Sequence, residues 1–293
     1  MPAWSHCPVC RQRADAPAWL IMTPLTWHRC SACDLVFKGE EPDGFMDDAH
    51  YEDDYFSGGS RQYDRRREHR IGKAQRQINA GQEFTSGTRL LDIGCSLGYA
   101  LEAGRRLGLD PVGLDLSETA RRACHEQGFE AVDGSMNALP FEAGRFDLVL
   151  MKHVLEHTPD PARALREVRR VTSPGACLMI AVPNLHYIKG RFAAWKHRYY
   201  NPKHAGREHY VYFSPSALTR LLEAEGFKVR AQSKAVFRRR LGRRGIVPAL
   251  RELSWFSLLW VWQGIASLLS LRREIFVVAQ HTARDDGSTQ IPT

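Results

Sequence analysis

The chain has 293 residues, 43% of them hydrophobic and 25% charged, and its net charge is +8. This composition is ordinary for a globular protein of one large domain or two, and it supplies ample apolar surface for a core. The moderate positive charge permits nucleic acid, an anionic membrane surface or a phosphorylated substrate as partner without selecting one of them. Residues 1–10 contain neither a basic stretch nor an apolar run, so we expect no secretory signal, and the seven cysteines then indicate a reducing cytoplasm rather than a disulfide framework.

Two C-x-x-C pairs, Cys7 with Cys10 and Cys30 with Cys33, lie near the start of the chain and are separated by 19 residues. Two such pairs place four thiolates tetrahedrally around zinc, and metal binding stabilises a segment that has little hydrophobic core. A redox role is less favoured because no thioredoxin-like pattern surrounds the pairs. The spacing therefore predicts a zinc ribbon over residues 1–40, with a structural zinc ion held by all four cysteines.

Residues 41–60 are acidic and contain the turn-forming pairs Asp43-Gly44 and Gly58-Gly59, which predicts a linker. From Arg61 to about Ala80 the polar, arginine-rich sequence predicts a solvated helix that covers the edge of a sheet. We expect the main domain to span residues 61–283, followed by a polar tail over 284–293.

The next stretch, Arg89-Leu-Leu-Asp-Ile-Gly-Cys-Ser-Leu-Gly98, predicts a buried parallel strand, a glycine loop and the start of a helix that runs to Leu107. Glycines let a ligand approach the backbone closely, and the unpaired amides at a helix N-terminus can bind an anionic group. Ser96 stands where the dinucleotide fingerprint requires glycine, so a nicotinamide cofactor is disfavoured.

This stretch resembles the first motif of the class I methyltransferases that use S-adenosylmethionine (SAM), D-x-G-x-G-x-G, with Ser96 in place of the middle glycine. The resemblance implies that the loop holds the methionine part of SAM. A second strand ends at Asp115, 23 positions after Asp92, where an acid can accept hydrogen bonds from both ribose hydroxyls. The cofactor-binding residues that the resemblance implies are Asp92, Gly94, Cys95, Gly98, Asp115, Leu116, Ser135, Met136 and Lys152.

The rest of the chain continues the alternation of strands and helices that predicts a parallel sheet. Further strands are predicted at 129–133, 146–151, 176–182, 227–235 and 275–280, and helices at 117–127 and 160–171 and after Pro215, with a turn at Pro174-Gly175. Gly134-Ser-Met-Asn-Ala-Leu-Pro-Phe141 is similar to the G-D-A-x-x-L-P-F stretch of the family, whose acid contacts the adenine amine. Here Ser135 replaces that acid with a hydroxyl, and Met136 is expected to pack on the adenine ring.

The fourth strand leads into Lys152-His-Val-Leu-Glu-His-Thr-Pro-Asp-Pro161, at the edge of the sheet where open α/β folds bind ligands. Methyl transfer to oxygen or nitrogen can require removal of a proton, and histidine is the residue type best suited to accept it, which makes His153 and His157 candidates; a structural role is the alternative for each. The same letters match the inverted zinc-protease motif, which is disfavoured because they follow a strand. Quinone-biosynthesis O-methyltransferases carry a similar E-x-x-E-H that binds a divalent cation, and His153 stands in place of its first acid.

Residues 184–213 are rich in Tyr, His, Arg and Lys, and loops at this place shape the acceptor pocket in the family. His209-Tyr-Val-Tyr-Phe-Ser-Pro215 resembles the family's H-x-x-x-F-S-P, which makes His209 a third candidate for acceptor contact. Methyltransferases with a zinc ribbon also carry a tyrosine pair similar to Tyr51 and Tyr55, which is taken to close over the active site. Packing of these linker aromatics on the main domain is the alternative.

Residues 237–273 begin with an arginine-rich run, and Leu253 to Leu271 contain no charged residue. The length suits a transmembrane helix, but a single span would separate the strand predicted at 275–280 from the sheet that it must join. The segment also has an apolar face opposite a serine-rich face, which favours an interfacial or re-entrant helix. The flanking arginines would then meet anionic headgroups. A buried core or dimer helix and an RNA-binding basic arm are the alternatives.

The sequence thus predicts an α/β fold: a Rossmann-like, seven-stranded methyltransferase sheet with a small N-terminal zinc ribbon and a hydrophobic helical insertion near the C-terminus. The resemblance implies a SAM-dependent methyltransferase, but its motifs do not name the acceptor. Our hypothesis is that it acts on a small-molecule, sugar, nucleotide-sugar or lipid-linked glycan acceptor, in the cytoplasm and peripherally on the inner membrane face. An rRNA methyltransferase and a non-catalytic membrane-associated scaffold are the two alternatives.

Overall fold

The structure, a computed structural model, describes residues 6–12, 20–22, 25–39, 66–185, 209–232 and 274–282. The predicted linker with its tyrosine pair, most of the predicted acceptor loop, the apolar segment 237–273 and the tail lie outside these residues. Within the described part of the chain, none of the helices combines the length and the hydrophobicity that crossing a membrane requires.

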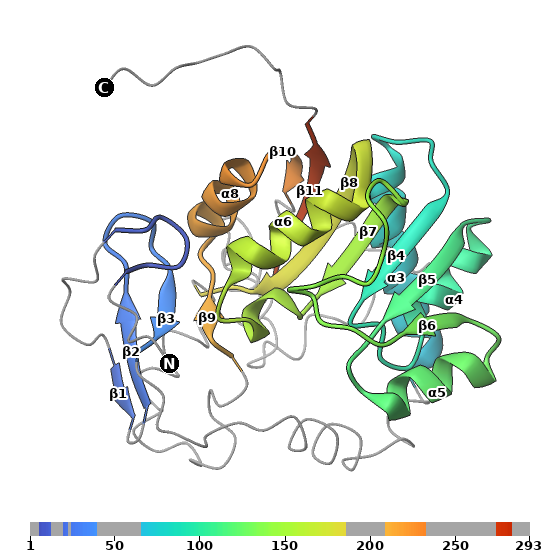
Figure 1. Cartoon of the computed structure of the whole chain (residues 1–293), viewed down its shortest axis with the longest axis horizontal. Coiled ribbons are helices and arrows are strands. Elements are labelled where there is room, and N and C mark those ends of the chain that lie inside the picture. The colour runs from blue at the N-terminus through green and yellow to red at the C-terminus, as the bar shows by residue number, and fades with distance from the viewer. Residues whose placement is uncertain are drawn as a thin grey trace, which may run out of the picture.

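Seven strands form the main sheet (Figure 1). Their order across the sheet is β10 (Phe227–Gln232), β11 (Glu274–His281), β8 (Thr172–Pro183), β7 (Phe146–Lys152), β4 (Arg89–Ile93), β5 (Asp110–Leu114) and β6 (Glu130–Val132). Strand β11 runs antiparallel to both of its neighbours, and the other pairs are parallel. The predicted Rossmann-like sheet of seven strands and the antiparallel pairing of its last two strands are therefore confirmed.

Helices cover both faces of this sheet. They are α3 (Arg67–Gln82), α4 (Tyr99–Arg106), α5 (Glu118–Glu126), the short 3-10 helix η1 (Leu155–His157), α6 (Pro161–Val171) and α8 (Pro215–Ala224). Figure 1 shows α6 and α8 on the near face and α3 behind the sheet. Three helices begin at a side-chain cap, because Ser117, Asp160 and Ser214 each accept a hydrogen bond from the backbone N–H three positions later.

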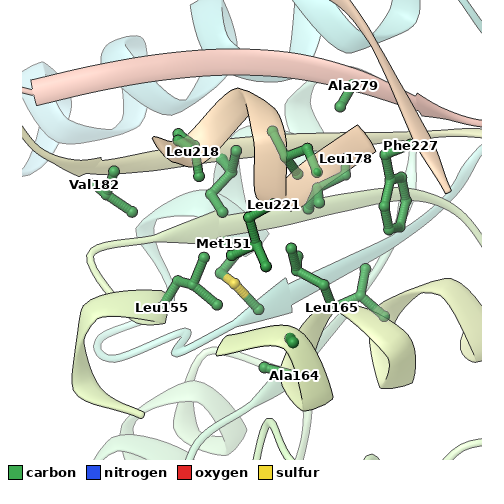
Figure 2. Packing of buried hydrophobic residues seen from close by; sticks show 14 of the residues in the cluster. Met151, Leu155, Ala164, Leu165, Leu178, Val182, Leu218, Leu221, Phe227 and Ala279 are labelled. Atoms are coloured by element: carbon green, nitrogen blue, oxygen red, sulfur yellow. The ribbon is translucent and has the colours of Figure 1, made fainter. Parts of the chain in front are cut away.

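The strand side chains alternate between two hydrophobic cores. Leu90 and Leu148 face the core under α3 and α4, whereas Leu91 and Val149 face the core under α6 and α8. Figure 2 shows the second core, where residues of the sheet meet those of α6 and α8. Because both faces of the sheet are buried, its strands contain nearly continuous apolar runs. These runs are the signal from which the strands were predicted.

Two predicted elements differ from the structure. Helix α3 covers the centre of one face of the sheet rather than its edge, and it is not a solvated layer, because Ile71, Ala74 and Ile78 are buried against β7 and β8. The predicted turn at Pro174-Gly175 lies inside β8, which starts directly after α6 and has an irregular register opposite the start of β7. Gly175 adopts a φ of +82°, so the chain bends there without leaving the strand.

A second, smaller sheet joins the N-terminal segment to the main domain. It contains β1 (Leu20–Met22), β2 (Leu25–Arg29), β3 (Val36–Lys38) and β9 (Val211–Tyr212), and all three pairs are antiparallel. Strand β9 comes from the far end of the chain, directly before α8. The sequence analysis did not foresee that the cysteine-bearing segment pairs with this distant strand.

Candidate functional site

The loop after β4 turns sharply because three of its residues adopt a left-handed conformation. Gly94, Ser96 and Gly98 have φ angles of +76°, +47° and +74°. A Cβ atom on Gly94 would lie 2.5 Å from the side chain of Val154, so glycine is required there for space as well as for φ. Ser96 adopts this conformation without being glycine, which explains why the related motif carries glycine at its position.

Asp115, at the end of β5, holds this loop in place. One carboxylate oxygen accepts a hydrogen bond from the backbone N–H of Ser96 at 2.8 Å, and the other accepts one from Ser117 at 3.0 Å. Burial raises the pKa of Asp115, and these two hydrogen bonds oppose that rise. Each oxygen keeps a further lone pair, so the carboxylate can still accept hydroxyl groups of a ligand.

The loop and the ends of β4, β5 and β7 surround one cavity. Its lining residues are Arg70, Ala74, Asp92, Gly94, Cys95, Ser96, Tyr99, Ala100, Asp115, Leu150, Lys152, His153 and Val154. Desolvation raises the pKa of the buried Asp92 to about 7, although the positive charge of Lys152 opposes this shift. Desolvation also lowers the pKa of Lys152. The Asp92 carboxyl group and the Lys152 amine are thus both held in the cavity, although each loses hydration there. Titratable groups with shifted pKa values in a cavity are typical of a binding site.

Helix α3 contributes two residues to this region that the sequence analysis did not single out. Arg70 lines the cavity, and its guanidinium lies 5.7 Å from the centre of the Tyr99 ring. Lys73, one turn further, forms an ion pair with Glu274 at the start of β11, at 2.7 Å. The sequence shows that Arg70 and Lys73 lie almost one helical turn apart. That their side chains point towards the cavity and Glu274 depends on the packing of α3 on the face of the sheet.

His153 lies between two carboxylates at the end of β7. Its Nδ1 is 3.3 Å from Glu156 Oε1, and its Nε2 is 3.2 Å from Glu274 Oε2. Burial disfavours the charged ring, but these two acids outweigh that effect and raise the pKa of His153 to about 9. Burial alone would raise the pKa of Glu274, yet its hydrogen bonds with His153 and Lys73 hold it at about 2. His153 is therefore an imidazolium at neutral pH, with an N–H directed at each acid.

His157 and His209 meet beside Glu156. Their rings form an edge-to-face contact with centres 4.7 Å apart, and one ligand atom of each of the three residues lies within 4.8 Å of the others. Burial lowers the pKa of His209 to about 4, with a further contribution from His157. Glu156 Oε2 and His209 Nδ1 are buried and have no hydrogen-bond partner among the described residues. This histidine cluster, Glu156 with His157 and His209, can therefore accept a polar ligand group or a cation.

The four predicted metal ligands come together in the small sheet. The Sγ atoms of Cys7 and Cys33 are 3.5 Å apart, those of Cys10 and Cys30 are 3.4 Å apart, and all four lie within 4.8 Å of one another. No disulfide joins any of these residues. These separations suit four thiolates around one tetrahedral zinc ion, as predicted.

Both cysteine pairs form the same kind of turn. In the first, the N–H of Arg11 donates to the carbonyl of Cys7; in the second, the N–H of Asp34 donates to that of Cys30. Arg11 and Asp34 each follow the second cysteine of a pair and adopt φ angles of +61° and +62°. Two matching turns that direct their thiols to one point support a metal site rather than two unrelated cysteine pairs.

Comparison with known proteins identifies the chemistry of the main domain. The family model of a methyltransferase domain, Methyltransf_23, matches residues 63–232. The chain belongs to this methyltransferase family. Its main domain is a methyltransferase domain. The family implies SAM as its cofactor. The glycine loop after β4 is the segment for which the sequence analysis predicts SAM binding.

Curated relatives of this methyltransferase include two ubiquinone biosynthesis O-methyltransferases. The protein from Methylococcus capsulatus is 30% identical over 123 residues, which are 40% of this chain and 52% of the relative. The protein from a Caulobacter species is 37% identical over 125 residues, 40% of this chain and 49% of the relative. The chain thus spans about half the length of the curated relatives it matches.

Solved structures confirm the fold. A Haloferax volcanii protein in complex with the Trm112 methyltransferase activator is similar with a TM-score of 0.56 and 18% identity, over 83% of this chain and 100% of that one. A SAM-dependent methyltransferase from Archaeoglobus fulgidus gives a TM-score of 0.52 and 20% identity, over 80% and 100%. At these identities the likeness concerns the fold.

The residues of this methyltransferase fit SAM at the cavity. The loop leaves room for a ligand where a Cβ on Gly94 would clash, and Asp92 and Asp115 offer carboxylates to a cofactor that carries positive charge. Cys95 and Lys152 line the cavity as well, and so does Tyr99, the residue that follows the N-cap Gly98 of α4.

Besides Gly98, three predicted cofactor residues are not among the residues that line the cavity. Leu116 follows Asp115 and has an exposed fraction of 56%, which is unusual for a large apolar side chain and leaves it free to cover a flat ring. The hydroxyl of Ser135 accepts a hydrogen bond from the N–H of Asn137, and Met136 packs on the core under α6. All three residues were predicted from their positions in the family motifs. A motif position does not reveal these local contacts.

Proposed function

We propose that this methyltransferase transfers the methyl group of SAM to a hydroxyl oxygen of a small-molecule acceptor bound between the cavity and the histidine cluster. The observation that carries the proposal is the position of Glu156, His157 and His209. Glu156 and His157 follow the carboxyl end of β7, where open α/β sheets bind their ligands, and His209 packs on His157 from the segment before β9. His153, which lines the cavity, contacts Glu156 and so joins this cluster to the cavity.

The cofactor would lie along the loop after β4. Asp115 would accept hydrogen bonds from the ribose hydroxyls, and the basic side chains of Arg70 and Lys152, which also line the cavity, suit the methionine carboxylate. SAM supplies an electrophilic methyl group on a sulfonium. The chain's own residues then need to align an acceptor oxygen with that methyl group, exclude water and accept the proton of the hydroxyl.

The proton is expected to move to the histidine cluster. His153 already carries two N–H groups directed at acids, so its ring has no nitrogen left to accept a proton. His209 is neutral near pH 7, and its buried Nδ1 has no partner within the part of the chain that the structure describes, so an acceptor hydroxyl can donate to it. A divalent cation held by Glu156, His157 and His209 would instead lower the pKa of a hydroxyl bound to it.

A hydroxyl acceptor is supported by the curated relatives, whose names describe O-methylation. Sugars, nucleotide-sugars and lipid-linked glycans are the hydroxyl-rich classes that we propose, and the basic, apolar segment 237–273 is the reason for expecting a lipid-linked or membrane-proximal acceptor. Flotation with anionic liposomes tests that segment. Deletion of residues 246–271 should abolish flotation, and equal flotation of the deleted protein would contradict an interfacial helix.

The acceptor class can be tested without knowing the acceptor. Purified protein is incubated with methyl-labelled SAM and fractionated cell extract, and the label is followed into RNA, lipid-extractable glycans and soluble metabolites. Label that stays bound as an alkali-stable methyl ether in the glycan or metabolite fractions supports the proposal. Label in RNA favours the rRNA alternative, whose RNA binding should weaken steeply with salt, and no transfer to any fraction favours the scaffold.

A further inference from the structure

The cysteine-bearing ribbon (residues 6–12 and 20–39, where described) shares a sheet with the acceptor side of the methyltransferase domain. Val36 and Phe37 of β3 pair with Tyr212 and Val211 of β9, and three of these four side chains are almost fully buried. Cys7, Cys30 and Cys33 belong to the same hydrophobic core as β9 and α8. The ribbon is therefore built into the domain at this side.

One contact joins the metal-binding turn to the start of α8. The hydroxyl of Ser214, which is fully buried, lies 3.3 Å from the carbonyl oxygen of Cys33 and donates to it. The same hydroxyl accepts the N–H of Ala217 and caps α8. The position of Cys33 is thus transmitted directly to the junction between β9 and α8.

A second set of contacts joins the ribbon to the histidine cluster. The N–H of Lys38 donates to the carbonyl of Tyr210 at 2.9 Å, and the N–H of Tyr210 donates to the carbonyl of Glu156 at 2.8 Å. Tyr212 contacts Trp27 of the ribbon on one side and His209 on the other, with ring centres 5.1 Å and 5.2 Å apart. Residues 209–212 are therefore held between the ribbon and η1.

The cavity for SAM is built differently. Its lining residues come from α3, from β4 with the loop and the start of α4 that follow it, and from the ends of β5 and β7, and none of those residues belongs to the described part of the ribbon. The two halves of the active site thus depend on different supports. A ribbon with three short strands and little core of its own holds its shape through the metal that its four thiolates bind.

We infer that the ribbon metal positions His209 and Tyr210, so that the acceptor half of the site depends on that metal while the cofactor half does not. The ribbon thus acts by positioning: its contacts reach the acceptor half through Tyr210 and Tyr212, which holds His209. That this positioning serves catalysis rests on the proposed function. The positioning itself does not, because its contacts exist without an acceptor.

Hydrogen exchange of the full-length protein tests this inference. Cys33→Ser removes one metal ligand, and Cys177→Ser is the matched control, because it makes the same substitution at a buried cysteine of β8 outside the ribbon. In Cys33→Ser we expect bound zinc to be lost and amide exchange over residues 209–213 to rise by about tenfold or more, with exchange over 89–99 unchanged. SAM affinity, measured by calorimetry, should stay within about twofold of the wild type. The control should retain zinc and the protection of 209–213.

A second variant keeps all four cysteines. Trp27→Ala removes the ring that contacts Tyr212 and should increase exchange over 209–213 to a smaller extent while zinc remains bound. Unchanged protection of 209–213 in both variants would overturn the inference. Equal loss of protection over 89–99 would overturn it too, because the ribbon would then support the whole domain. Neither result depends on which acceptor is methylated, so a failure here is distinct from a failure of the proposed function.

Discussion

The burial of Asp92 leads to an uncommon prediction: the substitution Asp92→Asn should stabilise the protein without SAM while weakening SAM binding. The carboxylate is 4% exposed, and its pKa is raised from 3.8 to about 7. Because the folded pKa lies above the unfolded one, folding favours the protonated acid. This stability is complete below about pH 4 and is lost as the pH rises towards 7.

The magnitude follows from the size of the shift. A difference of about three pKa units is worth about 4 kcal/mol when the acid is fully ionised, and less than half of that at pH 5. An asparagine does not titrate, so it avoids this loss, but its amide needs hydrogen bonds of its own, which reduces the expected net gain to about 1–3 kcal/mol at pH 8. A cation such as SAM stabilises the carboxylate, so the variant should bind SAM at least about tenfold more weakly.

Urea unfolding of the SAM-free protein at pH 5 and pH 8 measures this effect. The stability of Asp92→Asn relative to the wild type should increase with pH. Asp147→Asn is the control, because hydrogen bonds with Arg89 and Ser173 lower the pKa of Asp147 to about 2. That variant should be destabilised by about 1 kcal/mol at both pH values, since Arg89 is half exposed and Asp147 loses its contribution only as the pH falls from about 4 to 2. A destabilised Asp92→Asn at pH 8 would refute the reasoning.

Three further predictions concern the loop after β4. Ser96→Gly should raise the free energy of unfolding by up to about 1 kcal/mol in urea unfolding, because the left-handed conformation is strained for serine; a loss of stability would show that no such strain exists. Gly94→Ala should lower it by more than about 2 kcal/mol, since the new Cβ meets Val154, and an unchanged midpoint would contradict this close approach. Asp115→Ala should abolish SAM binding in calorimetry by removing the acceptor for Ser96 and the ribose, and undiminished affinity would contradict the pocket assignment.

Most of the fold could be predicted because local signals and packing agree. The strands β4 and β7 are buried on both faces and therefore have apolar runs, and the caps Ser117 and Asp160 mark helix starts in the sequence. Helix α3 was misplaced because its polar surface outweighs a narrow stripe of buried residues, of which only Ile71, Ala74 and Ile78 have apolar side chains. The pairing of β3 with β9 could not be predicted, because two short strands some 175 residues apart have no local signal for each other.

The residues of the candidate site were predictable where they follow a fixed spacing in the sequence. They were not predictable where only the fold brings them together. The glycine loop, Asp115 and the four cysteines have fixed spacings, and the structure brings each set together. Sequence spacing could not reveal that Glu274 pairs with His153 across 121 residues, and this contact changes the expected protonation of that histidine. For the same reason the sequence treated His153, His157 and His209 as equivalent candidates, whereas their surroundings differ.

The central claim is that SAM and the acceptor occupy two distinct halves of one site, with the histidine cluster serving the acceptor. The most direct test compares the wild type with His209→Ala in two measurements: SAM affinity by calorimetry, and transfer of label from methyl-labelled SAM to the small-molecule fractions of a cell extract. The account predicts SAM affinity within about twofold of the wild type and a loss of transfer of at least about a hundredfold. Full transfer by His209→Ala, or loss of its SAM binding, would contradict the account.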